Sequence, residues 1–361
     1  MGSIYKNGIG VSIFGESHGE AIGGVIDGFP SGVEIDMDHI LWLMDRRRPG
    51  KNKMSTTRKE TDIPRILSGV FNGFTTGTPI SFVIENNNKK SKDYSKLMNT
   101  PRPSHGDYSG LIKYKGFNDY RGGGHFSGRL TAPIVFIGAL CEQVLNSNGI
   151  KVFSKVESIG GIYDTDIESL DAFDIRKLRN KKLPLLSDEI GKKIEESIEE
   201  VRKQGDSIGG SVKTYIVGLK AGLGNPIFDN IEGHLARLLF SVPGIKSVEF
   251  GLGKDFARSK GSEVNDEFYY ENGIVKTYTN NNGGINGGIS NGMPIVHTVA
   301  MKPTPSIFKN QRTVDLKTGE NVDLQIEGRH DPCIVPRAIP VIEAISSIGI
   351  LDLLVKEGEL R

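Results

Sequence analysis

The chain has 361 residues, of which 37% are hydrophobic and 25% charged, as in an ordinary soluble protein with a substantial core. Its 45 Lys and Arg residues offset 44 Asp and Glu residues, which leaves a formal net charge of +1. A chain this close to neutral has no overall field that would attract nucleic acid or a membrane surface. Any anion binding must therefore come from local clusters of charge.

The sequence also sets expectations for compartment and domain organisation. No apolar run approaches the length of a membrane span, and the N-terminus lacks the charged tip and apolar core of a signal peptide. The two cysteines, Cys141 and Cys333, lie far apart in the chain, which favours two reduced thiols and a cytoplasmic protein. No linker-like segment marks a boundary, so residues 1–361 are expected to form one domain.

Hydrophobic periodicity and turn residues predict the elements in chain order. In the first half they predict strands at 11–14, 24–27 and 80–84 and helices at 38–48 and 131–145. In the second half they predict helices at 190–204, 229–240 and 338–355 and strands at 212–219 and 295–300. Asp38 and Asp229 are the expected N-caps of their helices.

Both halves show a strand, a glycine-rich loop and a helix in the same order, which indicates an internal duplication. Strands do not alternate regularly with helices, so a doubly wound parallel sheet is not favoured. The pattern predicts an α+β fold with antiparallel pairing.

The segment Gly15-Glu16-Ser17-His18-Gly19, placed at a junction after the first of these strands, has two interpretations. As G-x-S-x-G it matches the nucleophile elbow of a serine hydrolase, with Ser17 attacking. As a histidine on a glycine-flanked turn it is an acid–base group, with His18 reacting and Ser17 supporting the turn. The elbow interpretation is disfavoured by position, because such an elbow follows several strands and only fourteen residues precede this one.

Residues 46–65 contain the densest positive charge, with eight cations against two acids inside the segment and Asp45 just before it. Arginine offers paired donors that match carboxylate and phosphate oxygens. Because the rest of the chain is neutral and lacks a nucleic-acid module, this cluster favours a small, multiply anionic ligand. The eight cations are Arg46, Arg47, Arg48, Lys51, Lys53, Arg58, Lys59 and Arg65.

Two loops in the first half place a histidine among turn residues. Arg102–Tyr108 presents His105 beside Asp107, a carboxylate that can fix the tautomer of the imidazole. Tyr120–Arg129 has three successive glycines before a helix, an arrangement that can offer N–H groups to a phosphate. Neither a Walker loop nor a dinucleotide-binding G-x-G-x-x-G occurs, so ATP or NAD binding lacks its usual support.

Two further segments stand near the C-terminus. Lys302–Ser306 holds two prolines beside a lysine, and Gly328–Cys333 packs Arg329, His330 and Asp331 into three consecutive residues. Neither H-E-x-x-H nor C-x-x-C occurs, so no metal site is expected. An anion-binding module without catalysis would explain the arginines and glycines. It would not explain two histidines and an aspartate in separate turns.

Together these segments resemble the chorismate synthase family, from about residue 8 to 355 and in the same order. That resemblance implies a β-α-β sandwich, with helices between antiparallel sheets and an internal pseudo-twofold, assembled as a homotetramer. The six matching segments are Gly15–Gly19, Arg46–Gly50, Arg102–Asp107, Arg121–Arg129, Lys302–Ser306 and Gly328–Cys333.

The resemblance also implies a reaction and a cofactor. Members of this family bind FMN in its reduced form and convert 5-enolpyruvylshikimate 3-phosphate to chorismate and phosphate by a 1,4-anti elimination. This is the last step of the shikimate pathway, which leads to the aromatic amino acids. The implied class is a carbon–oxygen lyase acting on phosphates. No reductase domain is visible in the sequence, so an external flavin reductase is the expected reductant, with NADPH as an alternative.

By resemblance, the catalytic residues are His18 at the departing phosphate, His105 at the flavin and Asp331 at the ring proton. The expected substrate cations are Arg46, Arg47 and Arg129, and NADPH positions match Arg47 and Lys53. Positions that match the family's flavin contacts are His125, Phe126, Ser127, Pro243, Gly244, Gly287, Lys302, Pro303, Thr304, Pro305, Ser306 and Arg329.

This sequence departs from the family pattern at two places. His125-Phe126 stands where the family usually has an arginine followed by a small residue, and Pro243-Gly244 replaces a more usual Asn-Ala or Asp-Ala pair. The flavin contacts at these positions are therefore expected to differ in detail.

Overall fold

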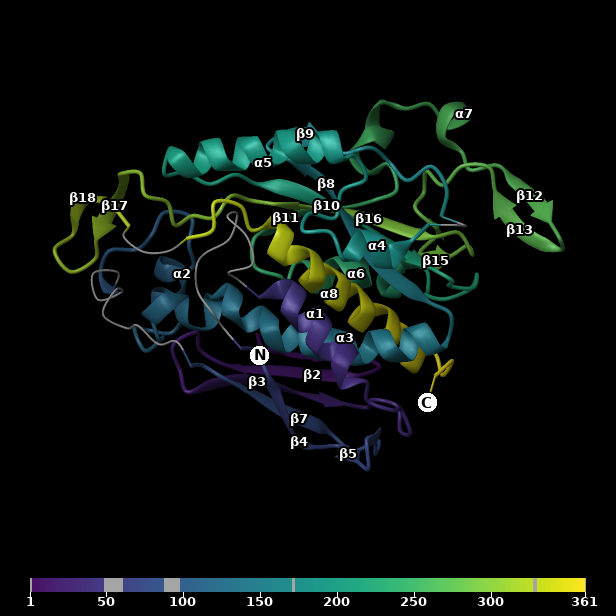
Figure 1. The fold of residues 1–361 in the computed structure, drawn as a ribbon, viewed down its shortest axis with the longest axis horizontal. Helices are drawn as coiled ribbons and strands as arrows, with labels where there is room; N and C mark the ends of the chain where they lie inside the picture. Colours follow the sequence, from purple (N-terminus) through teal and green to yellow (C-terminus); the bar gives the residue numbers. More distant parts are fainter. Residues whose placement is uncertain (1, 49–60, 88–97, 171–172, 327–329, 361) are drawn as a thin grey trace.

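The structure is a computed structural model that describes residues 2–48, 61–87, 98–170, 173–326 and 330–360. Two antiparallel sheets enclose a group of helices that lies between them (Figure 1). The α+β class and the β-α-β sandwich expected from the sequence are thereby confirmed.

The first sheet has five strands in the order β1-β2-β3-β7-β4. Its strands alternate in burial, and the face that carries Ile22, Ile26, Ile80 and Phe82 is buried against the helices. These strands confirm the three predicted for the first half. They are β1 (Ile4–Lys6), β2 (Gly10–Gly15), β3 (Ala21–Asp27), β4 (Pro64–Ser68) and β7 (Ile80–Glu85).

The second sheet also has five strands, in the order β11-β16-β10-β8-β9. Both of its faces are covered. The outer face buries Phe153, Tyr215 and Val296 in a cluster of their own. The strands are β8 (Lys151–Ile159), β9 (Ile162–Tyr163), β10 (Gly210–Val217), β11 (Ile245–Phe250) and β16 (Ile295–Met301).

The helical layer consists of α1 (Met37–Arg47), α3 (Thr131–Ser147), α6 (Ile231–Leu239) and α8 (Val335–Lys356), and α5 (Asp188–Lys203) lies over the second sheet (Figure 1). One apolar cluster runs from the first sheet through these helices to the second sheet. The central helices α3 and α8 are apolar on nearly all sides because neighbours surround them.

The remaining elements are short and lie mainly in connections and hairpins. They are β5 (Val70–Phe71), β6 (Phe74–Thr75), α2 (Asp107–Lys113), α4 (Ile175–Arg179), α7 (Gly261–Val264), β12 (Phe268–Glu271), β13 (Ile274–Thr277), β14 (Ile285–Asn286), β15 (Ile289–Ser290), β17 (Gln311–Asp315) and β18 (Glu320–Leu324). The hairpins β12–β13 and β17–β18 project from opposite ends of the molecule (Figure 1).

The two halves have similar topologies that differ only in the order of their first two strands. When the strands of each sheet are numbered in chain order, the first sheet reads 1-2-3-5-4 and the second reads 2-1-3-5-4. In each half a helix, α1 or α6, lies between the third and fourth strands, and a long central helix, α3 or α8, follows the fifth. This repeated order confirms the internal duplication expected from the sequence.

Two predicted caps are wrong by one or two residues. The carboxylate of Asp36, and not that of Asp38, accepts the backbone N–H of His39 and begins α1. The side chain of Asn230, and not that of Asp229, caps α6 through the N–H of Gly233. In both places a neighbouring residue has equally good capping chemistry, so composition alone does not choose between them.

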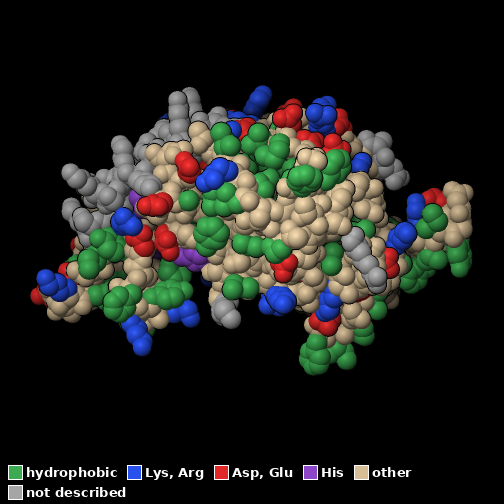
Figure 2. Space-filling view, turned by 90° about the horizontal axis from the view of Figure 1, so that it is seen from below, with side chains coloured by type: hydrophobic (Ala, Val, Ile, Leu, Met, Phe, Trp, Pro, Cys, Tyr) green, Lys and Arg blue, Asp and Glu red, His purple; other side chains and the backbone are tan. Residues whose placement is uncertain are grey.

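Two helices contradict the expectation that no apolar run reaches the length of a membrane span. Gly128–Ser147 and Val335–Lys356 are long and apolar enough, but 78% and 94% of their most apolar windows are buried inside the protein. They are core helices. On the face seen in Figure 2, basic and acidic side chains are interspersed, which fits the balanced composition.

Candidate active site

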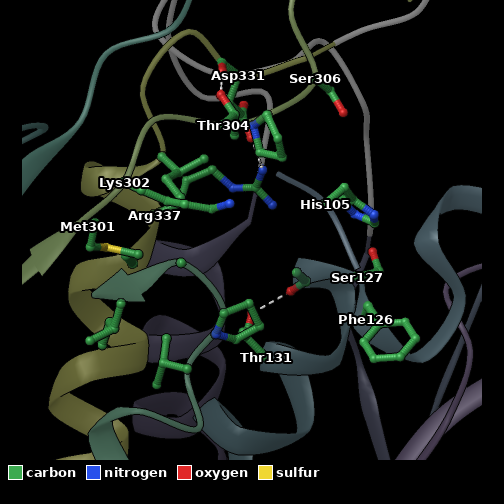
Figure 3. A pocket seen from close by; sticks show the side chains of 18 of the residues that line it. His105, Phe126, Ser127, Thr131, Met301, Lys302, Thr304, Ser306, Asp331 and Arg337 are labelled. Carbon is green, nitrogen blue, oxygen red and sulfur yellow. Dashed lines mark hydrogen bonds and ion pairs between the residues drawn. The ribbon is translucent and has the colours of Figure 1, made fainter. Parts of the chain in front are cut away.

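The two halves meet at a cavity of about 530 Å³, a size typical of small-molecule sites. The N-terminal ends of α3 and α8 both reach it, through Thr131 and Arg337. Because a helix N-terminus carries about half a positive charge, two of them raise the potential for anions here. Residues of the first half face residues of the second half across the cavity (Figure 3).

Thirteen of the residues expected from the sequence line this cavity. They come from α1, from the connection before α3, from the turn before β11 and from the connection between β16 and α8. They are Arg47, His105, Phe126, Ser127, Arg129, Pro243, Gly244, Lys302, Pro303, Thr304, Pro305, Ser306 and Asp331.

His105 is held in a charged network at the cavity wall. Its Nδ1 donates to Asp107 Oδ1 at 2.6 Å. Arg102 donates two hydrogen bonds to the same carboxylate, from Nε to Oδ2 at 2.7 Å and from Nη2 to Oδ1 at 2.8 Å. Burial alone would raise the pKa of the Asp107 carboxyl, but the hydrogen bonds from Arg102 and His105 outweigh burial and hold that pKa well below its usual range. Arg102 Nη1 also donates to Ser306 Oγ at 3.2 Å, which links the network to the second half.

His18 lies in the turn between β2 and β3, as the sequence predicted for its motif, and does not itself line the cavity. Its ring packs against Gly122, which does line the cavity. A Cβ at Gly122 would lie 2.2 Å from His18 Cε1. With φ at +60°, Gly122 requires the backbone freedom of glycine as well as the space.

Arg47 and Arg129 share a buried carboxylate. Asp62, whose side chain is fully buried, pairs with Arg129 Nη1 through Oδ1 and lies 3.5 Å from Arg47 Nη2 through Oδ2. Arg129 Nε also donates to Asn86 Oδ1 at 3.0 Å. The two guanidinium groups are therefore fixed side by side at the cavity wall.

Arg46 lies away from the cavity. Its guanidinium pairs with Glu343 of α8 and stacks over Trp42, 5.3 Å from the ring centroid, while Arg179 covers the same indole at 5.1 Å. Arg179 also pairs with Glu343 and with Glu142. This network joins α1, α3, α4 and α8 in the interior.

Of the four residues at which this sequence departs from the family pattern, three line the cavity and one does not. His125 does not line the cavity: its Nδ1 donates to Gly15 O at 2.8 Å and its Nε2 accepts from Ser3 Oγ at 2.6 Å. Phe126 lines the cavity and packs closely on Gly106 and Gly110, where a Cβ would lie 3.1 and 2.5 Å from its ring. Pro243 and Gly244 line the cavity as well, and Gly244 O accepts the N–H of Lys302 at 3.0 Å.

One other expected residue, Gly287, is not brought to the cavity, and two cannot be placed. Gly287 lies exposed in the turn between β14 and β15. Lys53 and Arg329 lie outside the described residues.

Lys302 and Lys246 add positive charge to the second-half wall. Burial, and to a lesser degree the charge of Lys246, lowers the pKa of the Lys302 ammonium. Lys302 Nζ donates to Ser104 O, a second link between the two halves at the cavity. Among the described residues, no group of three or more His, Cys, Asp or Glu side chains could hold a metal ion.

Sequence reasoning missed several residues of this site, among them Arg337 and Asp62. Arg337 lines the cavity and pairs with Asp331, and Asp62 holds the arginine pair. A signal existed for Arg337, which is a cation in the first turn of a largely apolar helix. The positive φ of Asp62, +47°, became visible only in the structure.

The cavity can thus bind an anion and exchange protons. Its cations come from both halves, and a histidine from one half faces an aspartate from the other. Apolar walls from Val242, Ile245, Met301 and Val341 leave room for a flat, partly apolar group.

Known proteins are similar to this chain in both sequence and fold. The family model described as chorismate synthase matches residues 9–355. A chorismate synthase of Thermococcus gammatolerans is 45% identical, over 97% of this chain and 98% of that protein. One of Methanobrevibacter smithii is 46% identical, over 97% of this chain and 96% of that protein.

A solved crystal structure of chorismate synthase superposes with a TM-score of 0.74 and 31% identity, covering 97% of this chain and 92% of that one. Sequence and fold agree over nearly the whole length, as the resemblance of the six segments led us to expect. The chain belongs to the chorismate synthase family.

Proposed function

We propose that this chain catalyses the 1,4-anti elimination of phosphate from 5-enolpyruvylshikimate 3-phosphate to give chorismate, as a carbon–oxygen lyase. In this reaction the C–O bond to phosphate breaks and a ring C–H bond breaks. The products are chorismate, inorganic phosphate and a proton, without net oxidation or reduction. The carrying observation is a single cavity that combines arginine and lysine side chains with His105 and Asp331 on opposite walls.

The charge of the cavity suits that substrate. The substrate carries two carboxylates and a phosphate, groups that arginine binds with paired donors. Arg47 and Arg129 are the proposed substrate ligands from the first half. Arg46 was also expected to bind the substrate, but its buried contacts with Glu343 and Trp42 favour a structural role.

The cavity also fits a reduced flavin mononucleotide. Glycine at 122 and 123 leaves the backbone flush against two histidines, since a Cβ at Gly123 would lie 3.1 Å from His105 Cε1. Phe126, Pro243 and Thr304 would hold the flat ring, and Lys302 the phosphate. When bound, reduced FMN supplies electron density that eases departure of the phosphate.

The protein's own residues are proposed to handle the protons. His18 donates a proton toward the departing phosphate past Gly122, which has no side chain. His105, fixed by Asp107 through Nδ1, would supply a proton to the flavin. Asp331 takes part in removal of the ring proton.

The remaining proposals concern the wider setting of the enzyme. We infer that residues 1–361 act as one domain within a homotetramer in the cytoplasm. An external flavin reductase is the proposed reductant, with NADPH at Arg47 and Lys53 as the alternative.

An anaerobic assay tests the function. Purified protein is mixed with 5-enolpyruvylshikimate 3-phosphate and photoreduced FMN, with no other protein present, and phosphate and chorismate are measured together. We expect equal amounts of both products with reduced FMN and none with oxidised FMN. Activity with oxidised flavin, or none under reducing conditions, would contradict the proposal. A parallel sample with NADPH and oxidised FMN shows whether the chain reduces its own flavin.

A further inference from the structure

Arg337 occupies a bridging position at the cavity. It lies in the first turn of α8, and its Nη1 donates to Asp331 Oδ2 at 2.5 Å. Its Nε donates to the carbonyl of Arg47, the last residue of α1, at 3.2 Å. Figure 3 shows the Arg337 side chain extended across the cavity wall toward Asp331.

Both contacts are physically favourable. The carbonyl groups at a helix C-terminus lack intrahelical partners and carry partial negative charge, so a guanidinium is a suitable donor to the end of α1. The pair with Asp331 is charge-assisted. Because α1 belongs to the first half and Asp331 to the second, Arg337 fixes the distance between them.

The backbone of Asp331 is held separately. Thr304 Oγ1 donates to Asp331 O at 2.8 Å, so the loop position does not depend on Arg337. What Arg337 adds is the direction of the carboxylate, whose side chain is only 9% exposed.

We propose that Arg337 is the positioning residue for Asp331: it aims the carboxylate at the ring proton of the substrate and acts on turnover through that carboxylate. This inference rests on the function proposed above. It assigns Arg337 no direct share in substrate affinity, unlike Arg47 and Arg129.

A double-mutant cycle tests the proposal. Arg337→Gln is expected to lower kcat roughly ten- to hundredfold, since small misplacements of a reacting group cost that much, with KM within about threefold of wild type. In an Asp331→Asn background the same change should cost less than about twofold, because the group it positions is gone. Arg337→Lys, which keeps a charge, should recover part of the loss and covers the case in which Arg337→Gln folds poorly.

Two outcomes would overturn the proposal. One is additive losses in the double variant, and the other is a large rise in KM with kcat unchanged. Arg202→Gln, which removes an exposed arginine paired with Glu199 on α5, is the matched control and should retain wild-type kinetics.

A binding measurement that needs no flavin gives an independent readout. Calorimetric titration of the flavin-free chain with 5-enolpyruvylshikimate 3-phosphate should give the same Kd for wild type and Arg337→Gln within about threefold. A tenfold weaker Kd would make Arg337 a substrate ligand and contradict the proposal. If wild type binds the substrate but releases no phosphate with reduced FMN, the proposed function is wrong. That result differs from additive losses in the double-mutant cycle, which would contradict only the role of Arg337.

Discussion

The two halves have similar topologies but fix their cavity walls in different ways. In the first half, the connection from β7 to α3 relies on glycines: Gly122, Gly123 and Gly124 all have positive φ. In the second half, the connection from β16 to α8 relies on prolines, with Pro303 and Pro305 beside the cavity. Glycine lets the backbone approach a ring closely, whereas proline limits the backbone to an extended form.

This difference distinguishes the features that both halves have in common from those in which the halves differ. Both halves supply a helix N-terminus and an Asp–Arg pair near the cavity, Asp107 with Arg102 and Asp331 with Arg337, although the two pairs occupy different positions in their halves. The parts that differ carry different ionisable groups: His105 comes with the glycine-rich wall, and Asp331 and His330 come with the proline-rich wall. A duplicated scaffold can therefore present unlike groups to the two sides of one ligand.

The largest effect is expected where the first half supplies an acid. His18→Ala should lower the rate of phosphate release roughly 10²- to 10⁴-fold, the usual contribution of a positioned acid or base. Ser17→Ala, one residue away in the same turn, should cost less than about tenfold. Both rates are measured anaerobically with reduced FMN and saturating substrate. A larger loss for Ser17→Ala than for His18→Ala would favour Ser17 as a nucleophile and contradict the role of His18 as the acid.

A smaller effect is expected from the glycine wall itself. Gly122→Ala places a Cβ in the space of the His18 ring, so that ring must move, and it forces an L-residue to φ +60°. We expect activity to fall at least roughly tenfold, together with a loss of about 1–2 kcal/mol in the free energy of unfolding. Steady-state rates and urea unfolding give the two quantities.

Gly273→Ala is the matched control from the second half. Gly273 has φ +80° in the turn of the β12–β13 hairpin, and a Cβ there would meet no atom within 4 Å. It should lose similar stability through backbone strain and keep its activity within about twofold. Equal activity losses in both variants would mean that strain, and not the displaced histidine, explains Gly122→Ala.

Much of the fold could be predicted from local sequence patterns. The strands around His18 and the helices α3, α5 and α8 followed from apolar periodicity, because each buries one face or is surrounded by neighbours. The strand orders did not follow, since pairings such as β4 with β7 or β10 with β16 depend on contacts between distant segments. The wrong caps, Asp38 and Asp229, failed because equally good cap residues lie beside them.

The site was predictable only where a motif carries its own turn. His105 and Asp331 could be singled out as charged groups among glycine and proline. The arginine cluster could not be resolved, because successive residues on a helix point about 100° apart. Arg47 therefore faces the cavity while Arg46 reaches Glu343. The partners of the site residues, Asp62 and Arg337, are distant in sequence and needed the structure.

The smallest expected effect is on the pH dependence of stability, which tests whether the two Asp–Arg pairs behave alike. The pKa of the Asp107 carboxyl is depressed in the folded chain, so its contribution to stability is present above its unfolded pKa, about 3.9, and is lost as pH falls toward the folded value. Wild type should therefore lose about 1 kcal/mol more stability than Asp107→Asn when the pH drops from 7 to 3, because most of the contribution is lost only below pH 3.

Urea unfolding at the two pH values measures this difference, and wild type and variant must be compared at equal salt because ion pairs are screened. The same measurement on Asp331→Asn shows whether the Asp331–Arg337 pair contributes to stability with the same pH dependence. If Asp107→Asn lowers stability equally at pH 7 and pH 3, the Arg102–Asp107–His105 network contributes through packing and not through its charges. The first-half wall would then be held by its glycines, and the likeness of the two Asp–Arg pairs would be one of composition only.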